Sequence, residues 1–369
     1  MEKEKKKGKG KKLNLIICGI AFLVMIFYLV FVDGIDTVVS ALCDINPLFI
    51  VICILFMVGY WLCEAGTVHI MLKELHPKMR FWNTWQVTII GQYFNCITPS
   101  ASGGQPMQAY YLVKFGVPLG SAMTALLSRF IVYQFTLTIY SIFTLIVGFS
   151  EFGDDLNKKG LMFFVLIGFV INTAVIVFLI GIAVWKTGTL KVANWLISFL
   201  TKIRICKNPM KWRVYISREV NKFHKNFNFL KKNIGIIIKS FILNFIQLTL
   251  FLSISYMLYL GFGMSEASLL QIISYQAYVL MISSFIPLPG AMGGAELGYT
   301  GFFGDIFGAY TGVSTMLWRI FTFYLPIIVG LYFTLTMKNQ GIDEPSDMDV
   351  KQNMYNMEKD MDITTSDTK

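Results

Sequence analysis

The feature that most constrains this chain is a series of apolar runs of 18 or more residues with few or no charged side chains. Residues 13–32, for example, contain no charged residue at all. Such a run is as long as the α-helix that crosses the hydrocarbon core of a bilayer. Only 15% of the 369 residues are charged, whereas soluble domains have about 25%. The sequence therefore predicts an all-α integral membrane protein.

The apolar runs predict about six full transmembrane helices. These cover approximately residues 13–32, 47–72, 120–149, 160–185, 234–260 and 311–337. The tail 1–12 has seven lysines against two glutamates, and the loop 150–159 is rich in acidic residues. Because Lys and Arg accumulate in cytoplasmic segments, we expect both termini to be cytoplasmic. The tail 338–369 is polar and net acidic, as disordered segments are.

The most basic segment between two predicted spans is 186–232, with twelve Lys or Arg and one acidic residue, Glu219. Apolar residues at i, i+3, i+4 and i+7 between Val192 and Ile203 predict an amphipathic helix in the headgroup layer. Basic and aromatic residues together are also typical of nucleic-acid-binding segments. Between two membrane spans, however, anionic phospholipid is the expected partner, and no nucleic acid is expected.

Two apolar stretches, at about 85–113 and 267–307, are interrupted by clusters of Pro and Gly. The first cluster is TPSASGGQP at 98–106, and the second is PLPGAMGGAE at 287–296. A helix broken at membrane depth leaves backbone polar groups unsatisfied, which is tolerated only inside protein or beside a wet cavity. We therefore predict two re-entrant pairs of broken helices, the first entering from the cytoplasm and the second from outside.

A shift of 190 residues brings the two breaks into one register. The aligned residues are Pro99 with Pro289, Gly103 with Gly293, Gly104 with Gly294, and Arg129 with Arg319. The halves that contain them, 13–185 and 233–337, are expected to enter the membrane from opposite sides, which predicts an inverted repeat. In transporters with such repeats, paired broken helices mark a substrate site near the bilayer midplane.

The predicted substrate-binding residues lie at these breaks and on the two intramembrane arginines. An ionisable group at this depth is costly and often functional, and the guanidinium fork suits phosphate. Each arginine could instead belong to a structural ion pair, such as Arg319 with Glu296. The neutral polar residues could contact a headgroup or satisfy the broken backbone. The set is Arg129, Arg319, Asn95, Ser100, Ser102, Gly103, Gly104, Gln105, Gly293, Gly294 and Glu296.

Other chemistry has little support in the sequence. The six cysteines show no metal-binding spacing and there are three histidines, so neither a metal nor a cofactor is expected, and no catalytic residue is assigned. Glu64 lies near the predicted cytoplasmic end of its span, where a plain interfacial position is expected.

At the two breaks the sequence resembles the lysylphosphatidylglycerol synthase transmembrane-region family, which includes the flippase half of the bacterial multiple peptide resistance factor. The matching segments are 95–106 and 287–296, within a resemblance that covers roughly 13–337. This resemblance implies a lipid-translocating fold in a bacterial plasma membrane. It also implies a phosphatidylglycerol or lysylphosphatidylglycerol cargo and a link to cationic peptide resistance.

Three functions stay open at this point. The first is a flippase-like transporter of phospholipid. The second is a phosphatidylglycerol lysyltransferase that uses lysyl-tRNA, although 32 polar residues stand where the full-length synthases carry a soluble transfer domain. The third is a membrane anchor or partner of such a synthase. Candidate protein partners are accordingly a lipid synthase and a second copy of this chain.

Overall fold

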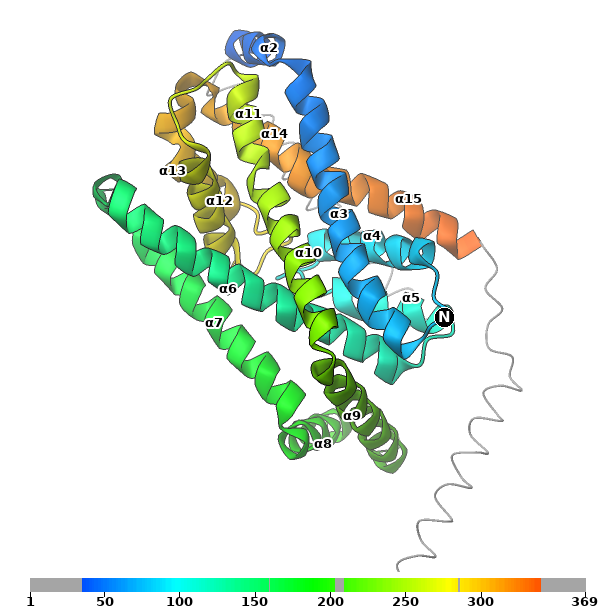
Figure 1. The fold of residues 1–369 in the computed structure, drawn as a ribbon. Coiled ribbons are helices and arrows are strands. Elements are labelled where there is room, and N and C mark those ends of the chain that lie inside the picture. The colour runs from blue at the N-terminus through cyan, green and yellow to red at the C-terminus, as the bar shows by residue number, and fades with distance from the viewer. Residues whose placement is uncertain (1–34, 159, 203–208, 285, 340–369) are drawn as a thin grey trace, which may run out of the picture.

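The computed structural model describes residues 35–158, 160–202, 209–284 and 286–339, and every regular element in these ranges is helical (Figure 1). The all-α membrane fold is thereby confirmed. The predicted span 13–32 and the tails 1–12 and 340–369 lie outside the described residues. The helices are α2 (Ile35–Asp44), α3 (Pro47–Leu75), α4 (Phe81–Ile97), α5 (Gly104–Lys114), α6 (Leu119–Lys158), α7 (Leu161–Val184), α8 (Lys186–Lys202), α9 (Pro209–Lys232), α10 (Ile234–Leu252), α11 (Ile254–Gly261), α12 (Leu269–Ser284), α13 (Gly294–Phe307), η2 (Gly308–Tyr310), α14 (Thr311–Arg319), η3 (Ile320–Tyr324) and α15 (Leu325–Asn339).

Five helical segments are long and apolar enough to cross a membrane. They are Pro47–Leu75, Leu119–Val147, Met162–Val184, Ile234–Gly261 and Gly294–Met337. The last segment is not one straight helix, because the backbone turns at Gly308, where φ is 51°, and α13 packs against α14. The number of crossings and the inverted repeat stay predictions.

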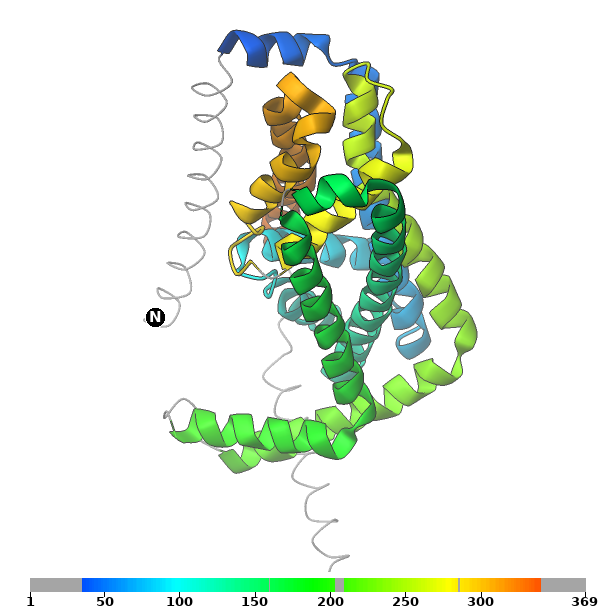
Figure 2. The same ribbon diagram turned by 90° about the vertical axis from the view of Figure 1, so that its left-hand side faces the viewer.

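Two helix pairs are broken where the Pro and Gly clusters stand. Helices α4 and α5 flank the first break, and α12 and α13 flank the second. The tips of the two pairs meet at about mid-length of the spanning helices (Figure 1), on one side of the bundle (Figure 2). There, Pro99 and Pro289 form an isolated antiparallel β-bridge. The two breaks are therefore in contact with each other, while residues 99–102, 287 and 288 stay exposed.

Each broken pair is held by its own apolar core. Ile90, Leu112 and Leu126 belong to the cluster around α4 and α5, whereas Tyr278, Tyr299 and Phe303 belong to the cluster around α12 and α13. The outward-facing positions of α7, such as Val177 and Phe178, leave large apolar side chains exposed. On a helix long enough to cross a bilayer, such a surface fits contact with lipid.

The basic segment folds into a hairpin of α8 and α9, which lies across one end of the spanning helices, while α2 lies across the other end (Figure 2). On α8, Ile197 is buried against the protein, whereas Val192 and Trp195 are exposed. A crosswise helix with exposed apolar and aromatic side chains fits the membrane–water interface.

The ends of the molecule supply a test of orientation. Cys43 is exposed on α2, and Asn221 is exposed on α9 at the opposite end. If basic α8–α9 is cytoplasmic, a membrane-impermeant maleimide should label Cys43 in intact cells. In a Cys43→Ser background, Asn221→Cys should be labelled only after permeabilisation. The reverse pattern would invert the predicted topology.

Candidate functional site

An open cavity of about 250 Å³ lies between the tips of the two broken pairs. Ser100 and Ala101 line it from the first break, and Gly290 and Ala291 line it from the second. Further walls come from α4, α10, α12, α14 and η3. The cavity therefore lies where both halves of the described chain meet.

The backbone at the two breaks has the same local conformation. Ser100 and Ala101 both have φ of 50°, and at the aligned positions Gly290 and Ala291 have φ of 59° and 52°. In each break the amide of the second of these residues donates to the carbonyl three residues earlier, over 3.2 Å and 2.9 Å respectively. A side chain in the left-handed region is strained by about 1–3 kcal/mol, and such strain gathers at functional sites.

Side chains of the same segments satisfy much of the broken backbone. The Gly103 amide donates to Thr98 Oγ1 at 2.8 Å, and the Gly104 amide donates to Asn95 Oδ1 at 3.1 Å. In the second break, the Gly293 amide donates to Glu296 Oε2 at 2.7 Å. Asn95 thus caps the backbone while it also lines the cavity. The chain itself therefore uses these three N–H groups.

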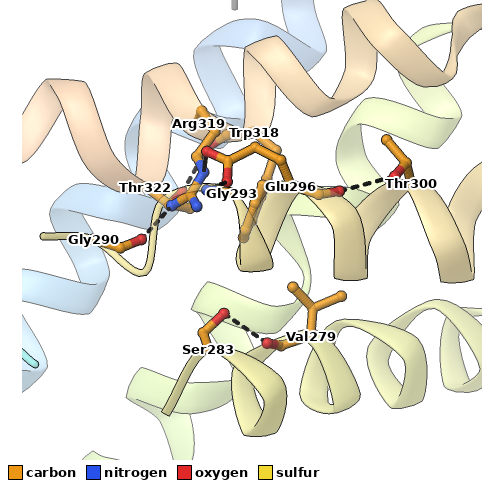
Figure 3. A network of polar contacts seen from close by, with 9 residues as sticks. All are labelled: Val279, Ser283, Gly290, Gly293, Glu296, Thr300, Trp318, Arg319 and Thr322. Atoms are coloured by element: carbon orange, nitrogen blue, oxygen red, sulfur yellow. Dashed lines mark hydrogen bonds and ion pairs between the residues drawn. The ribbon is translucent and has the colours of Figure 1, made fainter. Parts of the chain in front are cut away.

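Arg319 is the buried cation of the cavity (Figure 3). Its Nε lies 2.7 Å from Glu296 Oε1, and its Nη1 donates to the Gly290 carbonyl at 3.0 Å. The guanidinium lies 4.8 Å from the ring centroid of Trp318. Among the described residues, Nη2 has no hydrogen-bond partner. Arg319 therefore forms the predicted ion pair with Glu296 and still has a donor for a ligand.

Arg129 lies elsewhere. Its Nη2 is 3.1 Å from Glu64 Oε1, it does not line the cavity, and Gln92 Nε2 donates to Glu64 Oε2. Glu64 is completely buried, so the interfacial position expected from the sequence is wrong. The reason is that the re-entrant helix α4 packs along α3 and covers this carboxylate. The two arginines do not share one cavity in this structure.

Of the other predicted residues, one lines the cavity and the rest lie outside it. Ser100 lines the cavity, whereas Ser102, Gly103, Gly104, Gln105, Gly293, Gly294 and Glu296 do not. Ser102 Oγ donates to the Pro99 carbonyl at 2.9 Å, which stabilises the turn.

Among the lining residues that sequence reasoning missed, Gln276 and Trp318 carry buried donors. Ser255 Oγ donates to Gln276 Oε1 at 2.5 Å, while Gln276 Nε2 and Trp318 Nε1 have no hydrogen-bond partner in the described part of the chain. Both side chains are buried. The only available signal was an amide inside an apolar run, which is weak on its own.

Comparisons with known proteins agree on the class. A family model described as "Lysylphosphatidylglycerol synthase TM region" matches residues 16–330. A UPF0104 membrane protein of Archaeoglobus fulgidus is 25% identical over 294 residues, which cover 77% of this chain and 85% of that protein. Another UPF0104 membrane protein, of Methanocaldococcus jannaschii, is 24% identical over 353 residues, covering 89% and 96%.

The buried pair of Arg129 and Glu64 should be a stability element. Replacing Glu64 with Gln leaves a buried guanidinium without a counter-ion, which should cost about 3–5 kcal/mol. Glu296→Gln should cost less, because the Glu296 side chain is 28% exposed. The measurement is thermal unfolding in detergent. Removing both partners, in Glu64→Gln with Arg129→Gln, should recover part of the loss. A double variant less stable than Glu64→Gln alone would contradict a structural pair.

The start of α5 should tolerate no side chain at Gly104. A Cβ there would stand 2.1 Å from Asn95 Oδ1 and 2.7 Å from the Gly91 carbonyl oxygen. Gly104→Ala should therefore cost about 1–3 kcal/mol of stability by overpacking. Gly181→Ala in α7 is the matched control, since nothing lies within 4 Å of its added Cβ. Equal unfolding temperatures for both variants would show that α5 is not closely packed on α4.

Proposed function

The chain belongs to the lysylphosphatidylglycerol synthase transmembrane-region family, and from that premise we propose that it moves a phospholipid between membrane leaflets, as a flippase does. The expected cargo is phosphatidylglycerol or a lysylphosphatidylglycerol-type lipid. In a bacterial plasma membrane, delivery of a lysylated lipid to the outer leaflet would make the outer surface of the membrane less negatively charged. Cationic peptides would then be attracted less strongly.

The observation that carries this proposal is the buried Arg319 in a cavity between two broken helix pairs. A phosphate crossing the hydrocarbon core needs a counter-charge and donors that replace water. Arg319, Gln276 and Trp318 line the cavity, and one buried donor of each, on Nη2, Nε2 and Nε1 respectively, has no partner in the described chain. Together they offer a headgroup the polar contacts that lipid tails lack.

The charge of the cavity favours a headgroup with both signs. Glu296 already balances Arg319, so a phosphate alone would add one uncompensated negative charge. An ammonium group on the same headgroup would restore neutrality beside the partly exposed Glu296 carboxylate. An aminoacylated or zwitterionic phospholipid therefore suits the site better than a purely anionic one.

The two tips suggest how access could alternate. One isolated β-bridge, between Pro99 and Pro289, joins them. Separating one bridge disturbs far less structure than bending a continuous helix. We propose that α4–α5 and α12–α13 move apart in turn, each exposing the cavity to its own side of the membrane, as the paired broken helices of transporters do.

The experiment is leaflet exchange of fluorescent phospholipid in liposomes that contain only this protein. Arg319→Gln should lower exchange by about tenfold or more, since a hydrogen bond to a charged group contributes about 1.5–3 kcal/mol. Arg319→Lys keeps the charge without the planar fork, so its exchange rate should lie between those of the wild type and Arg319→Gln. Glu296→Gln should impair a lysylated lipid more than phosphatidylglycerol.

The unfolding temperature of each variant in detergent is the control that shows whether the variant is folded. Exchange lost only in proportion to unfolding would make Arg319 structural. Wild-type exchange by a folded Arg319→Gln variant would exclude the proposed site.

A further inference from the structure

A second cavity, of about 380 Å³, lies apart from the Arg319 site, among α6, α7, α9 and α10. Its floor is buried and includes Met71, Ser128 and Ile236, which are 2%, 6% and 5% exposed. Apart from Ser128 and Lys231, every lining side chain is apolar. The volume is that of ordinary ligand sites, so this crevice is large enough to hold a molecule.

The crevice opens sideways. Phe135 on α6, Ile180 on α7 and Ile238 on α10 form its rim, and each is exposed by 44% or more. All three stand on segments long and apolar enough to span a membrane. An occupant therefore enters from the hydrocarbon of the bilayer, and the part of it that fills the crevice must be apolar.

One end of the crevice is cationic. Lys231 lines the crevice from the last turn of α9. This helix ends at Lys232, and α10 begins at Ile234. The Lys231 side chain is exposed and has no acidic partner in the described part of the chain. The charge at this end thus complements an anion at the level of the headgroups.

We propose that this crevice binds an acyl chain of an anionic phospholipid, with the lipid phosphate paired to Lys231. Such a lipid matches both the apolar walls and the single charged end. A neutral amphiphile would leave Lys231 without a partner, and a phosphate-bearing soluble molecule would leave the apolar floor unfilled. The site is independent of the proposed translocation, because none of its residues lines the Arg319 cavity.

The test uses the full chain in nanodiscs that contain phosphatidylglycerol with a diazirine in one acyl chain. After irradiation, mass spectrometry of peptides should find adducts concentrated on the crevice segments of α6 and α10, around Val132 and Ile237. Lys231→Gln should lower this adduct yield about fivefold, because losing an ion pair that contributes about 1 kcal/mol to binding weakens binding by that factor.

Lys232→Gln is the matched control. Lys232 is the next residue, is also exposed and carries the same charge, but does not line the crevice. It should leave the adduct yield unchanged. Phosphatidylcholine with the same diazirine should label the crevice as weakly as phosphatidylglycerol labels the Lys231→Gln variant. Equal effects of the two Lys variants, or equal labelling by both lipids, would overturn the assignment of the phosphate to Lys231.

A variant that fills the crevice with a larger side chain tests whether an acyl chain occupies it. Val132→Phe should remove most adducts, and Ile237→Phe serves the same purpose if the first variant unfolds. Adducts spread evenly over all lipid-facing helices would mean ordinary annular lipid and would overturn the proposal. Arg319→Gln should leave labelling unchanged, so failure of this site and failure of translocation are separately visible.

Discussion

A helix that is broken inside a membrane must find partners for its backbone N–H and C=O groups within the protein, and the centre of this structure is built around that need. Thr98, Asn95 and Glu296 accept hydrogen bonds from the amides that open α5 and α13. The tips then pair with each other through Pro99 and Pro289. Each break is thus completed by local side chains and by its contact with the other break.

The same arrangement gives the two buried arginines different surroundings. Arg319 takes its carboxylate from the first turn of α13, in its own half of the chain, and borders the cavity. Arg129 likewise takes its carboxylate from another helix of its own half, α3, but Glu64 is fully buried and Arg129 does not border the cavity. Two residues that align in sequence therefore have different surroundings. Arg319 borders the cavity, and its Nη2 has no partner among the described residues, whereas the pair of Arg129 and Glu64 joins α6 to α3.

Much of the fold could be predicted from the sequence, because span length and helix-breaking residues are local signals. The breaks at Pro99 and Pro289, the basic hairpin and the family resemblance were all available in this way, and the structure and the comparisons confirm the membrane fold and the family. The burial of Glu64 could not be predicted from the sequence, because it depends on α4 folding back along α3. Gln276 was missed for a related reason, since one amide in an apolar run gives no sign of where it points.

The central claim is that lipid headgroups pass where the two tips meet. Ser100 and Leu288 flank the bridge on opposite tips and both line the cavity. In a chain without native cysteines, Ser100→Cys with Leu288→Cys should form a disulfide across the tips. Leaflet exchange of fluorescent phospholipid should stop when this disulfide is oxidised and return when it is reduced, while each single variant exchanges normally. Undiminished exchange by the cross-linked protein would contradict the account.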